Sequence, residues 1–256
     1  MNIGPNQNLS SLRIISSINL ASMAMNKASA KVSSGWKINF AADDPAGLVI
    51  SEAMRARIAG LNQEIENTSI TMDKYSTADS ALLQMRSNLT EMRTLALAAG
   101  DSGVIDDSMR GAYQAEADNL TVNYNRIATQ ASFGDQKLLD GSSGSVANLP
   151  PLTGFNLSSS AEAQESLKAI DEEIARVDAA IGQVGATEKY GLESRLNSLR
   201  IEMQNLTAAE SQIRDTDYAS VFADFLKNKL ILHSAVSLLS HQDISARTVL
   251  NLLNSE

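Results

Sequence analysis

The sequence predicts a mainly α fold, a long antiparallel helical bundle or coiled coil with a small β-hairpin region near its central turn. Two observations lead to this prediction. The four prolines leave two long proline-free tracts, 46–149 and 152–256, in which helices can run without interruption. In both tracts apolar residues recur at alternating steps of three and four, the spacing typical of helices packed lengthwise against each other.

An amphipathic helix is expected in residues 1–33. The stretch after Arg13, with the small residues Ala28-Ser29-Ala30, imitates a secretory signal and its cleavage site. Because serines and an asparagine interrupt that stretch, a retained helix is the better interpretation. Its apolar residues step by threes and fours, at Leu9, Leu12, Ile15, Ile18, Ala21, Met25, Ala28 and Val32.

Two apolar seams predict paired helices in the middle of the chain. The first seam occupies 58–99, and a further helix at about 106–130 follows a turn that begins at Gly100. The second seam occupies 163–213 and contains a single eight-residue step at 185–191. These two seams are plausible partners for each other.

The chain is expected to turn back at 140–160. Breaker and turn residues are concentrated there, as Asp140-Gly-Ser-Ser-Gly-Ser and then Asn148-Leu-Pro-Pro-Leu-Thr-Gly. A few apolar residues between Val146 and Leu157 offer little more than a hairpin.

The composition excludes several classes of function. Cysteine is absent, which excludes a disulfide scaffold, a thiol nucleophile and a cysteine-based metal site. The net charge of −9 and the pI of about 4.8 disfavour a nucleic-acid partner. No run approaches the roughly 18 apolar residues of a membrane span, so membrane insertion is not expected.

The residues that could carry chemistry have simpler structural explanations. The pairs Asp43-Asp44 and Asp106-Asp107 each precede a predicted helix, where a carboxylate caps the helix and favours its dipole. Pro45 suits the first helical position after Asp44. The two histidines lack a third metal ligand, and no catalytic or phosphate-binding motif is present. The sequence therefore predicts no enzyme, no cofactor and no metal site.

The two ends of the chain differ from its middle in charge. Residues 1–33 carry three basic and no acidic side chains, and residues 230–242 carry no charged side chain apart from histidine. Helices of this kind can bury their apolar faces against each other and then against copies of the chain in a polymer. Docking of both ends on the chain's own bundle is the alternative.

Two long motifs resemble bacterial flagellin, the subunit of the flagellar filament. The first is Lys31-Val-Ser-Ser-Gly-Trp-Lys-Ile-Asn-Phe-Ala-Ala-Asp-Asp-Pro-Ala-Gly. The second, which is the more specific, is Asn205-Leu-Thr-Ala-Ala-Glu-Ser-Gln-Ile-Arg-Asp-Thr-Asp-Tyr-Ala. With shorter matches, the similarity covers about 1–140 and 160–256, in the order of the family.

This resemblance implies a domain plan. The terminal helices, 1–33 and 218–256, would pair in an inner domain that lines the filament lumen. Residues 34–44 and 214–217 would be linkers, and 45–213 an outer helical domain with the 140–160 turn at its tip. The family inserts large variable outer domains at this turn, so the chain resembles a minimal flagellin.

The resemblance also implies site residues. Trp36 and Phe40 are bulkier than the family's usual residues and are expected at a subunit contact. Arg214, Asp215 and Asp217 are expected either in ion pairs between subunits or in a solvated charge cluster. The linker and subunit-contact residues are Gly35, Trp36, Phe40, Arg214, Asp215 and Asp217. The assembly residues of the inner helices are Leu9, Leu12, Ile15, Ile18, Met25, Phe222, Leu226, Leu230, Val236, Leu239, Leu250 and Leu253.

Two surface properties follow from the same resemblance. At the family's innate-immune receptor site, Leu95 matches the usual leucine, but Glu91 replaces an arginine and Val122 replaces an acid. The reversed charge predicts weak receptor binding. Many flagellins carry O-linked sugars on exposed outer segments, for which this chain offers Ser142, Ser143, Ser145 and Thr153.

The expected function is a structural subunit that self-assembles into the bacterial flagellar filament. Its implied partners are copies of itself, an export chaperone at the C-terminal helix, and the filament cap and hook-junction proteins. The implied location is the extracellular filament, reached by the flagellar type III pathway without a cleaved signal peptide, with a sheathed or periplasmic filament left open. A hook–filament junction protein and a soluble helical binding module are the alternatives.

Overall fold

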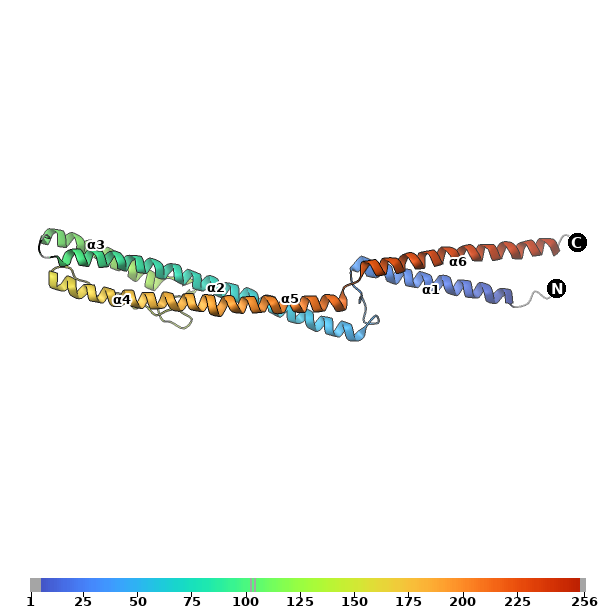
Figure 1. The fold of residues 1–256 in the computed structure, drawn as a ribbon, viewed down its shortest axis with the longest axis horizontal. Helices are drawn as coiled ribbons and strands as arrows, with labels where there is room; N and C mark the ends of the chain where they lie inside the picture. Colours follow the sequence, from blue (N-terminus) through green and yellow to red (C-terminus); the bar gives the residue numbers. More distant parts are fainter. Residues whose placement is uncertain (1–5, 102, 104, 254–256) are drawn as a thin grey trace. The chain divides into compact units, whose positions relative to one another are not determined.

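The computed structural model describes residues 6–101, 103 and 105–253, and the side chains of residues 9–101, 103 and 105–241. The described residues are mostly helical, and the only paired strands among them form one small hairpin, as the sequence predicts (Figure 1). The helices are α1 (Asn6–Ser34), α2 (Pro45–Gly100), α3 (Asp107–Gln130), α4 (Ser160–Ala186), the π-helix η1 (Thr187–Glu193), α5 (Ser194–Arg214) and α6 (Tyr218–Leu253). The strands are β1 (Ser132–Phe133) and β2 (Gln136–Lys137).

The chain forms two compact units. One consists of residues 1–60 and 203–256, and the other of residues 61–202. Long helices cross both boundaries, because α2 begins in the first unit and ends in the second, and α5 does the reverse. The first unit therefore contains, besides the terminal helices, the beginning of α2 and the end of α5.

The core of the 61–202 unit lies between α2, α3 and α4, which run side by side (Figure 1). Leucines and methionines of α2 occupy the predicted heptad positions and are fully buried, at Leu82, Met85, Leu89 and Met92. From α4, Ile170 and Val177 pack into the same cluster. Interdigitated apolar side chains at heptad spacing are what hold such helices lengthwise.

Two ion pairs connect α2 to α4 in register. Arg86 Nε lies 2.5 Å from Asp178 Oδ1, and Arg93 Nε lies 2.6 Å from Asp171 Oδ1. The pairs are seven residues apart on both helices and run in opposite directions, which makes the helices antiparallel. All four side chains are about half exposed, so each pair contributes less than about 1 kcal/mol and mainly specifies register.

The chain reverses direction between α2 and α3, after Gly100 as the sequence predicts, and again around the 140–160 segment. Asp106 caps α3 by accepting a hydrogen bond from Met109 N at 2.8 Å. The 140–160 segment runs back along α3, where Asn125 Oδ1 accepts from Leu152 N and Gln114 Oε1 accepts from Leu157 N, and α4 then runs antiparallel to α2. Amide side chains of α3 thus satisfy the backbone of an irregular segment.

The small hairpin lies near the 140–160 segment, directly before it. Its strands pair Ser132 with Lys137 and Phe133 with Gln136, and Gly134, with φ of +58°, makes the tight turn possible. Within 140–160 only an isolated bridge, Asp140 to Asn148, is found. The two prolines at 150 and 151 have no N–H to donate, which opposes strand pairing there.

The eight-residue step of the second seam coincides with η1. A regular helix continuing the heptads beyond Val184 would turn Glu188, Gly191 and Arg195 toward the core. A π-helical turn contains one extra residue. The eight-residue step from Val184 to Leu192 therefore keeps the following residues Leu196 and Leu199 on the buried face. Since α4, η1 and α5 follow one another without a gap, the seam is continuous in space although its sequence phase shifts.

Within the described ranges, no helix is both long and apolar enough to cross a membrane.

Removing the Tyr124 hydroxyl is expected to destabilise the 61–202 unit. Tyr124 is fully buried and donates to Glu173 Oε1 at 2.6 Å, and burial together with this carboxylate raises the pKa of Tyr124 far above its usual value. Tyr124→Phe leaves a buried carboxylate with one partner fewer, which costs about 1–3 kcal/mol of unfolding free energy. Urea unfolding followed by circular dichroism measures the loss. The matched control is Tyr113→Phe in the same helix, and an equal loss in both variants would contradict the assignment.

Candidate assembly interface

The terminal helices α1 and α6 form an antiparallel pair (Figure 1). Their least exposed side chains recur at heptad spacing and therefore define the seam between them. Among the side chains that the structure describes in this seam, only alanines are deeply buried, namely Ala21, Ala28 and Ala235. The seam of α1 comprises Ile14, Ile18, Ala21, Met25, Ala28 and Val32, and that of α6 comprises Val221, Phe225, Asn228, Leu232, Ala235 and Leu239.

Most of the predicted assembly residues lie outside this seam and are exposed. Leu9, Leu12 and Ile15 on α1 are 44–56% exposed, and Phe222, Leu226, Leu230 and Val236 on α6 are 44–68% exposed. Ile18, Met25 and Leu239 are half-buried in the seam. Leu250 and Leu253 lie outside the residues whose side chains the structure describes.

Further exposed apolar residues escaped the sequence prediction. Leu20 and Met23 on α1 are 66% and 69% exposed, and Ile231 and Leu238 on α6 are also uncovered. A search for one apolar stripe cannot find them, because both helices are apolar on more than one face. Exposed apolar surface of this extent marks a surface that another molecule covers.

The two predicted linkers are joined to each other. Gly35, with φ of +77°, ends α1, and its N–H donates to Lys31 O at 2.9 Å. Lys37 N donates to Arg214 O at 2.7 Å, and Thr216 N donates to Gly35 O at 2.9 Å. These bonds form an isolated antiparallel bridge between residues 36 and 215. We call this pair of linkers the joint.

Arg214 lies at the centre of the joint. Its guanidinium stacks over the Trp36 ring at 4.2 Å, and its Nη1 lies 2.6 Å from Glu52 Oε1 of α2. The hydrogen bond from Arg214 holds the pKa of the Glu52 carboxyl below its usual value. Arg214 thus has a carboxylate partner within the chain, and an ion pair between subunits is not needed to account for it.

The other charged residues of the joint also have local roles. Asp215 accepts from Ser211 Oγ at 2.6 Å, and Asp217 caps α6 by accepting from Ala219 N and Ser220 N. The remaining predicted contact residues, Trp36 and Phe40, are 41% and 68% exposed, so part of each ring is open for a neighbour.

Of the acidic pair before α2, Asp44 caps the helix as expected, whereas Asp43 binds the preceding linker and α1. Asp44 Oδ1 accepts from Gly47 N at 3.0 Å, and α2 begins at Pro45. Asp43 Oδ2 accepts from Asn39 N and Phe40 N, and Asp43 Oδ1 pairs with Lys27 of α1 at 2.7 Å. The hydrogen bond from Lys27 is the main reason that the pKa of Asp43 lies below its usual value.

The residues expected at the receptor site all belong to the 61–202 unit. Glu91 is exposed on α2, Leu95 is half-buried against the core, and Val122 on α3 is 65% exposed. The hydroxyl residues offered for O-linked sugars lie in the irregular segment after the hairpin. Ser142, Ser143 and Thr153 are exposed there, and Ser145 is half-buried.

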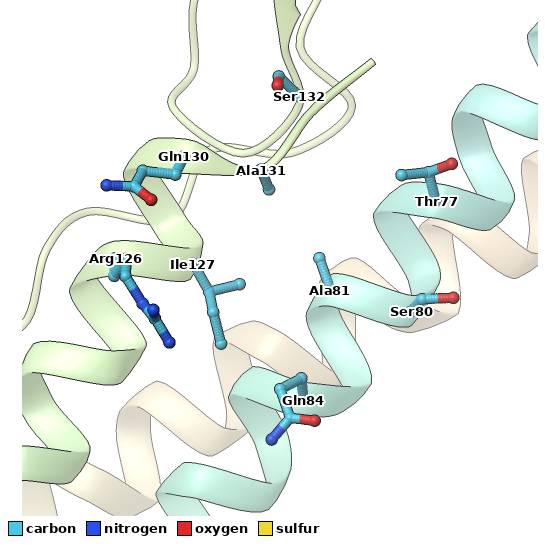
Figure 2. Close-up of a pocket in the computed structure, with 9 residues that line it drawn as sticks. All are labelled: Thr77, Ser80, Ala81, Gln84, Arg126, Ile127, Gln130, Ala131 and Ser132. Carbon is cyan, nitrogen blue, oxygen red and sulfur yellow. The ribbon is translucent and has the colours of Figure 1, made fainter.

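An open groove of about 510 Å³ lies between α2 and the end of α3 (Figure 2). The hydroxyls of Thr77 and Ser80 donate to carbonyls of their own helix, and Arg126 donates to Asn123 Oδ1 at 3.3 Å. No carboxylate or imidazole lines the groove, so it offers no acid–base pair. Its lining residues are Thr77, Ser80, Ala81, Gln84, Arg126, Ile127, Gln130, Ala131 and Ser132.

No group of three or more acidic, histidine or cysteine side chains that could hold a metal ion occurs among the described residues. The features that stand out are instead a paired set of terminal helices with uncovered apolar faces and a joint that ties them to α2. Such features define a helical subunit built to assemble with further copies.

Comparison with known proteins agrees with this class. The model of the bacterial flagellin N-terminal helical region matches residues 6–144, and that of the bacterial flagellin C-terminal helical region matches residues 167–253. The chain belongs to the bacterial flagellin family. It is a structural protein, a self-polymerising subunit of the extracellular flagellar filament that serves motility.

Relatives match over nearly their whole length. Flagellin of Halalkalibacterium halodurans is 32% identical, over 89% of this chain and 91% of the relative. Flagellin of Bacillus subtilis is 28% identical over 97% of this chain and 99% of the relative, and flagellin FlaB1 of Treponema pallidum is 28% identical over the same shares. A crystal structure of Bacillus cereus flagellin is 21% identical, covers 55% of this chain and 88% of that chain, and has a TM-score of 0.42.

Acid is expected to loosen the joint. Asp43 and Glu52 both have pKa values below their usual ones, so the stability they add is present above about pH 4 and is lost as pH falls through their folded-state values. Trp36 is the only tryptophan, and its near-ultraviolet circular dichroism should therefore decline below about pH 4. Lys27→Met should move this decline to higher pH. An unchanged signal down to pH 2, or an unshifted decline in the variant, would contradict the prediction.

Proposed function

We propose that the exposed apolar faces of α1 and α6 are the surfaces through which copies of this chain build the filament. The observation that carries this proposal is the exposure of large apolar side chains on both helices after they have paired. Neighbouring copies would cover these faces, so that 1–33 and 218–256 line the lumen. Residues 45–213 would form the outer wall, and 34–44 and 214–217 would connect the two domains.

The same exposed faces imply transient partners before assembly. Leu226, Leu230 and Leu238 on α6 would expose apolar surface to the cytoplasm, which an export chaperone would cover. The subunit would leave through the flagellar type III pathway without cleavage of a signal peptide. It would then assemble beneath the filament cap, with hook-junction proteins at the base of the polymer.

We propose that the outer surface of the subunit carries no large additional domain. The segment at 140–160 takes the place of the family's large outer domains, and its exposed Ser142, Ser143 and Thr153, with Ser145, are the positions for O-linked sugars. We assign the chain no catalytic activity, since its role is mechanical.

Polymerisation provides the direct test of the assembly surfaces. Leu12→Ser combined with Leu230→Ser changes two exposed residues, 56% and 68% accessible, and should leave the free subunit folded. Each leucine loses about 1.5–3 kcal/mol of burial in the polymer, so the critical concentration for elongation from seeds should rise at least about tenfold.

The control for this test changes polar residues on the same helices. Asn19→Ser combined with Ser237→Ala alters two exposed positions and should elongate like the natural chain. Negative-stain electron microscopy and sedimentation would measure both variants. Normal elongation by the leucine variant would refute the assigned surfaces.

Receptor recognition provides a gain-of-function test. Glu91→Arg combined with Val122→Glu restores the family's charges beside Leu95, and we expect the response of receptor-bearing reporter cells to rise at least about tenfold. Glu193→Arg in η1 is the control, because it changes an exposed acid to arginine in an element that carries none of the three residues. An equal response of both variants would show that Glu91 and Val122 do not limit recognition.

A further inference from the structure

Tyr190 differs from the other aromatic residues of the 61–202 unit. It lies in η1 and is 73% exposed. The other aromatic residues of this unit all belong to its core cluster or pack against it, namely Tyr75, Tyr113, Tyr124, Phe133 and Phe155. Single exposed apolar side chains are common on protein surfaces, so Tyr190 is informative only together with a site that fits it.

The groove between α2 and the end of α3 is such a site (Figure 2). Ala81 and Ile127 point toward each other across it and give it an apolar centre, while Gln84 and Gln130 line it with exposed amides. An aromatic ring with a hydroxyl suits this combination, because the ring can cover the apolar centre and the hydroxyl can bond to an amide. The volume of about 510 Å³ leaves room for one such side chain.

The groove and Tyr190 lie on opposite sides of α2. Thr77 and Gln84 line the groove and lie about half a turn around the helix from Arg86 and Arg93. These two arginines pair with α4, and η1 continues α4 without a gap. Tyr190 therefore belongs to the side of α2 that faces α4, and a copy placed beside this one in the same orientation can bring its η1 to the groove.

The groove and Tyr190 also lie at the same level of the bundle. Asp178 of α4 pairs with Arg86 of α2, and Arg195 of α5 pairs with Glu64 of α2 at 3.8 Å. Tyr190 falls between Asp178 and Arg195 in the chain, so it lies alongside the part of α2 between Glu64 and Arg86. The same part of α2 lines the groove, so a neighbour needs little displacement along the bundle axis to bring the two together.

The charges at the two surfaces are complementary. Arg126 lines the groove, donates to Asn123 Oδ1 at 3.3 Å and has no carboxylate partner among the described residues. Glu193, three residues after Tyr190, is exposed and forms no ion pair within the described part of the chain. A guanidinium can also lie against the face of a tyrosine ring. The cation of the groove thus matches an acid and an aromatic ring on η1.

We propose that Tyr190 of one copy inserts into the groove between α2 and α3 of the copy beside it. The contact joins two different surfaces of the same chain, and a contact of this kind can repeat from copy to copy without closing, as a filament requires. The proposal rests on the outer-wall role of residues 45–213 proposed above. It is independent of the surfaces assigned to α1 and α6.

Cross-linking in assembled filaments of the full chain tests the contact directly. The chain has no cysteine, so Gln84→Cys combined with Glu193→Cys introduces one thiol at each surface and leaves Tyr190 in place. A short bis-maleimide should then give a ladder of dimers, trimers and longer products on a denaturing gel, because every copy carries both thiols. Gln84→Cys combined with Glu165→Cys is the control, since Glu165 is exposed near the beginning of α4, and it should give no ladder.

The other outcomes of cross-linking would overturn the contact. Dimers without longer products would indicate a two-fold contact instead of a head-to-tail one. The absence of products, or a link within one chain, would show that η1 does not reach a neighbour's groove.

Elongation from seeds measures the strength of the contact. Tyr190→Ser removes the inserted ring, and Ala81→Leu fills the groove from its apolar centre. Each variant should raise the critical concentration at least about fivefold, because an aromatic side chain is no longer buried in the polymer. The double variant should be no weaker than the single ones, since both changes remove one contact. Tyr190→Phe keeps the ring and should elongate within about twofold of the natural chain.

Ile201→Ser is the control for this coupling, because it removes an apolar side chain of α5 that is 59% exposed. Its effect, whatever its size, should add to that of Ala81→Leu. Unchanged thermal unfolding would show that each variant has folded. Normal elongation of Tyr190→Ser, or independent effects of Tyr190→Ser and Ala81→Leu, would overturn the contact.

Failure of this proposal can be distinguished from failure of the assembly function. If Tyr190→Ser elongates normally while Leu12→Ser combined with Leu230→Ser does not, the contact between outer units is wrong and the surfaces of α1 and α6 stand. If the leucine variant elongates normally while the ladder forms, the assigned terminal surfaces are wrong and the contact through Tyr190 stands.

Discussion

A pair of α-helices has too little interior to bury all of its apolar surface, and the organisation of this subunit depends on that constraint. Alanines line the deepest part of the seam between α1 and α6, so these helices approach closely while their large apolar side chains stay uncovered. The free subunit retains an unfavourable exposed apolar area. If neighbouring copies cover it, as we propose, polymerisation completes the burial that the fold begins.

The 61–202 unit, in contrast, can bury its large apolar side chains, because three helices enclose a core. Met85, Leu89 and Met92 are fully buried there, and even the buried carboxylate Glu173 has partners in Tyr124 and Arg176. Two local features keep this core continuous. The π-helix η1 accommodates one extra residue, and amide side chains of α3 accept hydrogen bonds from backbone N–H groups of the irregular segment that leads to α4. This unit therefore has a closed core of its own.

The joint ties the terminal helix pair to the beginning of α2 without adding a large core of its own. It uses directional contacts instead, namely a two-bond bridge, a stacked guanidinium and ion pairs to Glu52 and Asp43. Such contacts specify geometry more than they add stability, because one partner of each ion pair, Lys27 or Glu52, is more than half exposed. A thin connection of this kind is consistent with a polymer whose subunits transmit force through long helices.

The sequence by itself determined the helical class, the caps at Asp44 and Asp106, the heptad seams of α2 and α4, the phase step at η1 and the family. These features are local or periodic, so spacing and residue type reveal them. Only the tertiary structure decided which face of α6 forms the seam, because that helix is apolar on more than one face and its period cannot select one of them. It also gave Arg214 its partners Trp36 and Glu52. Both outcomes depend on segments far apart in the sequence meeting in space, which no local pattern records.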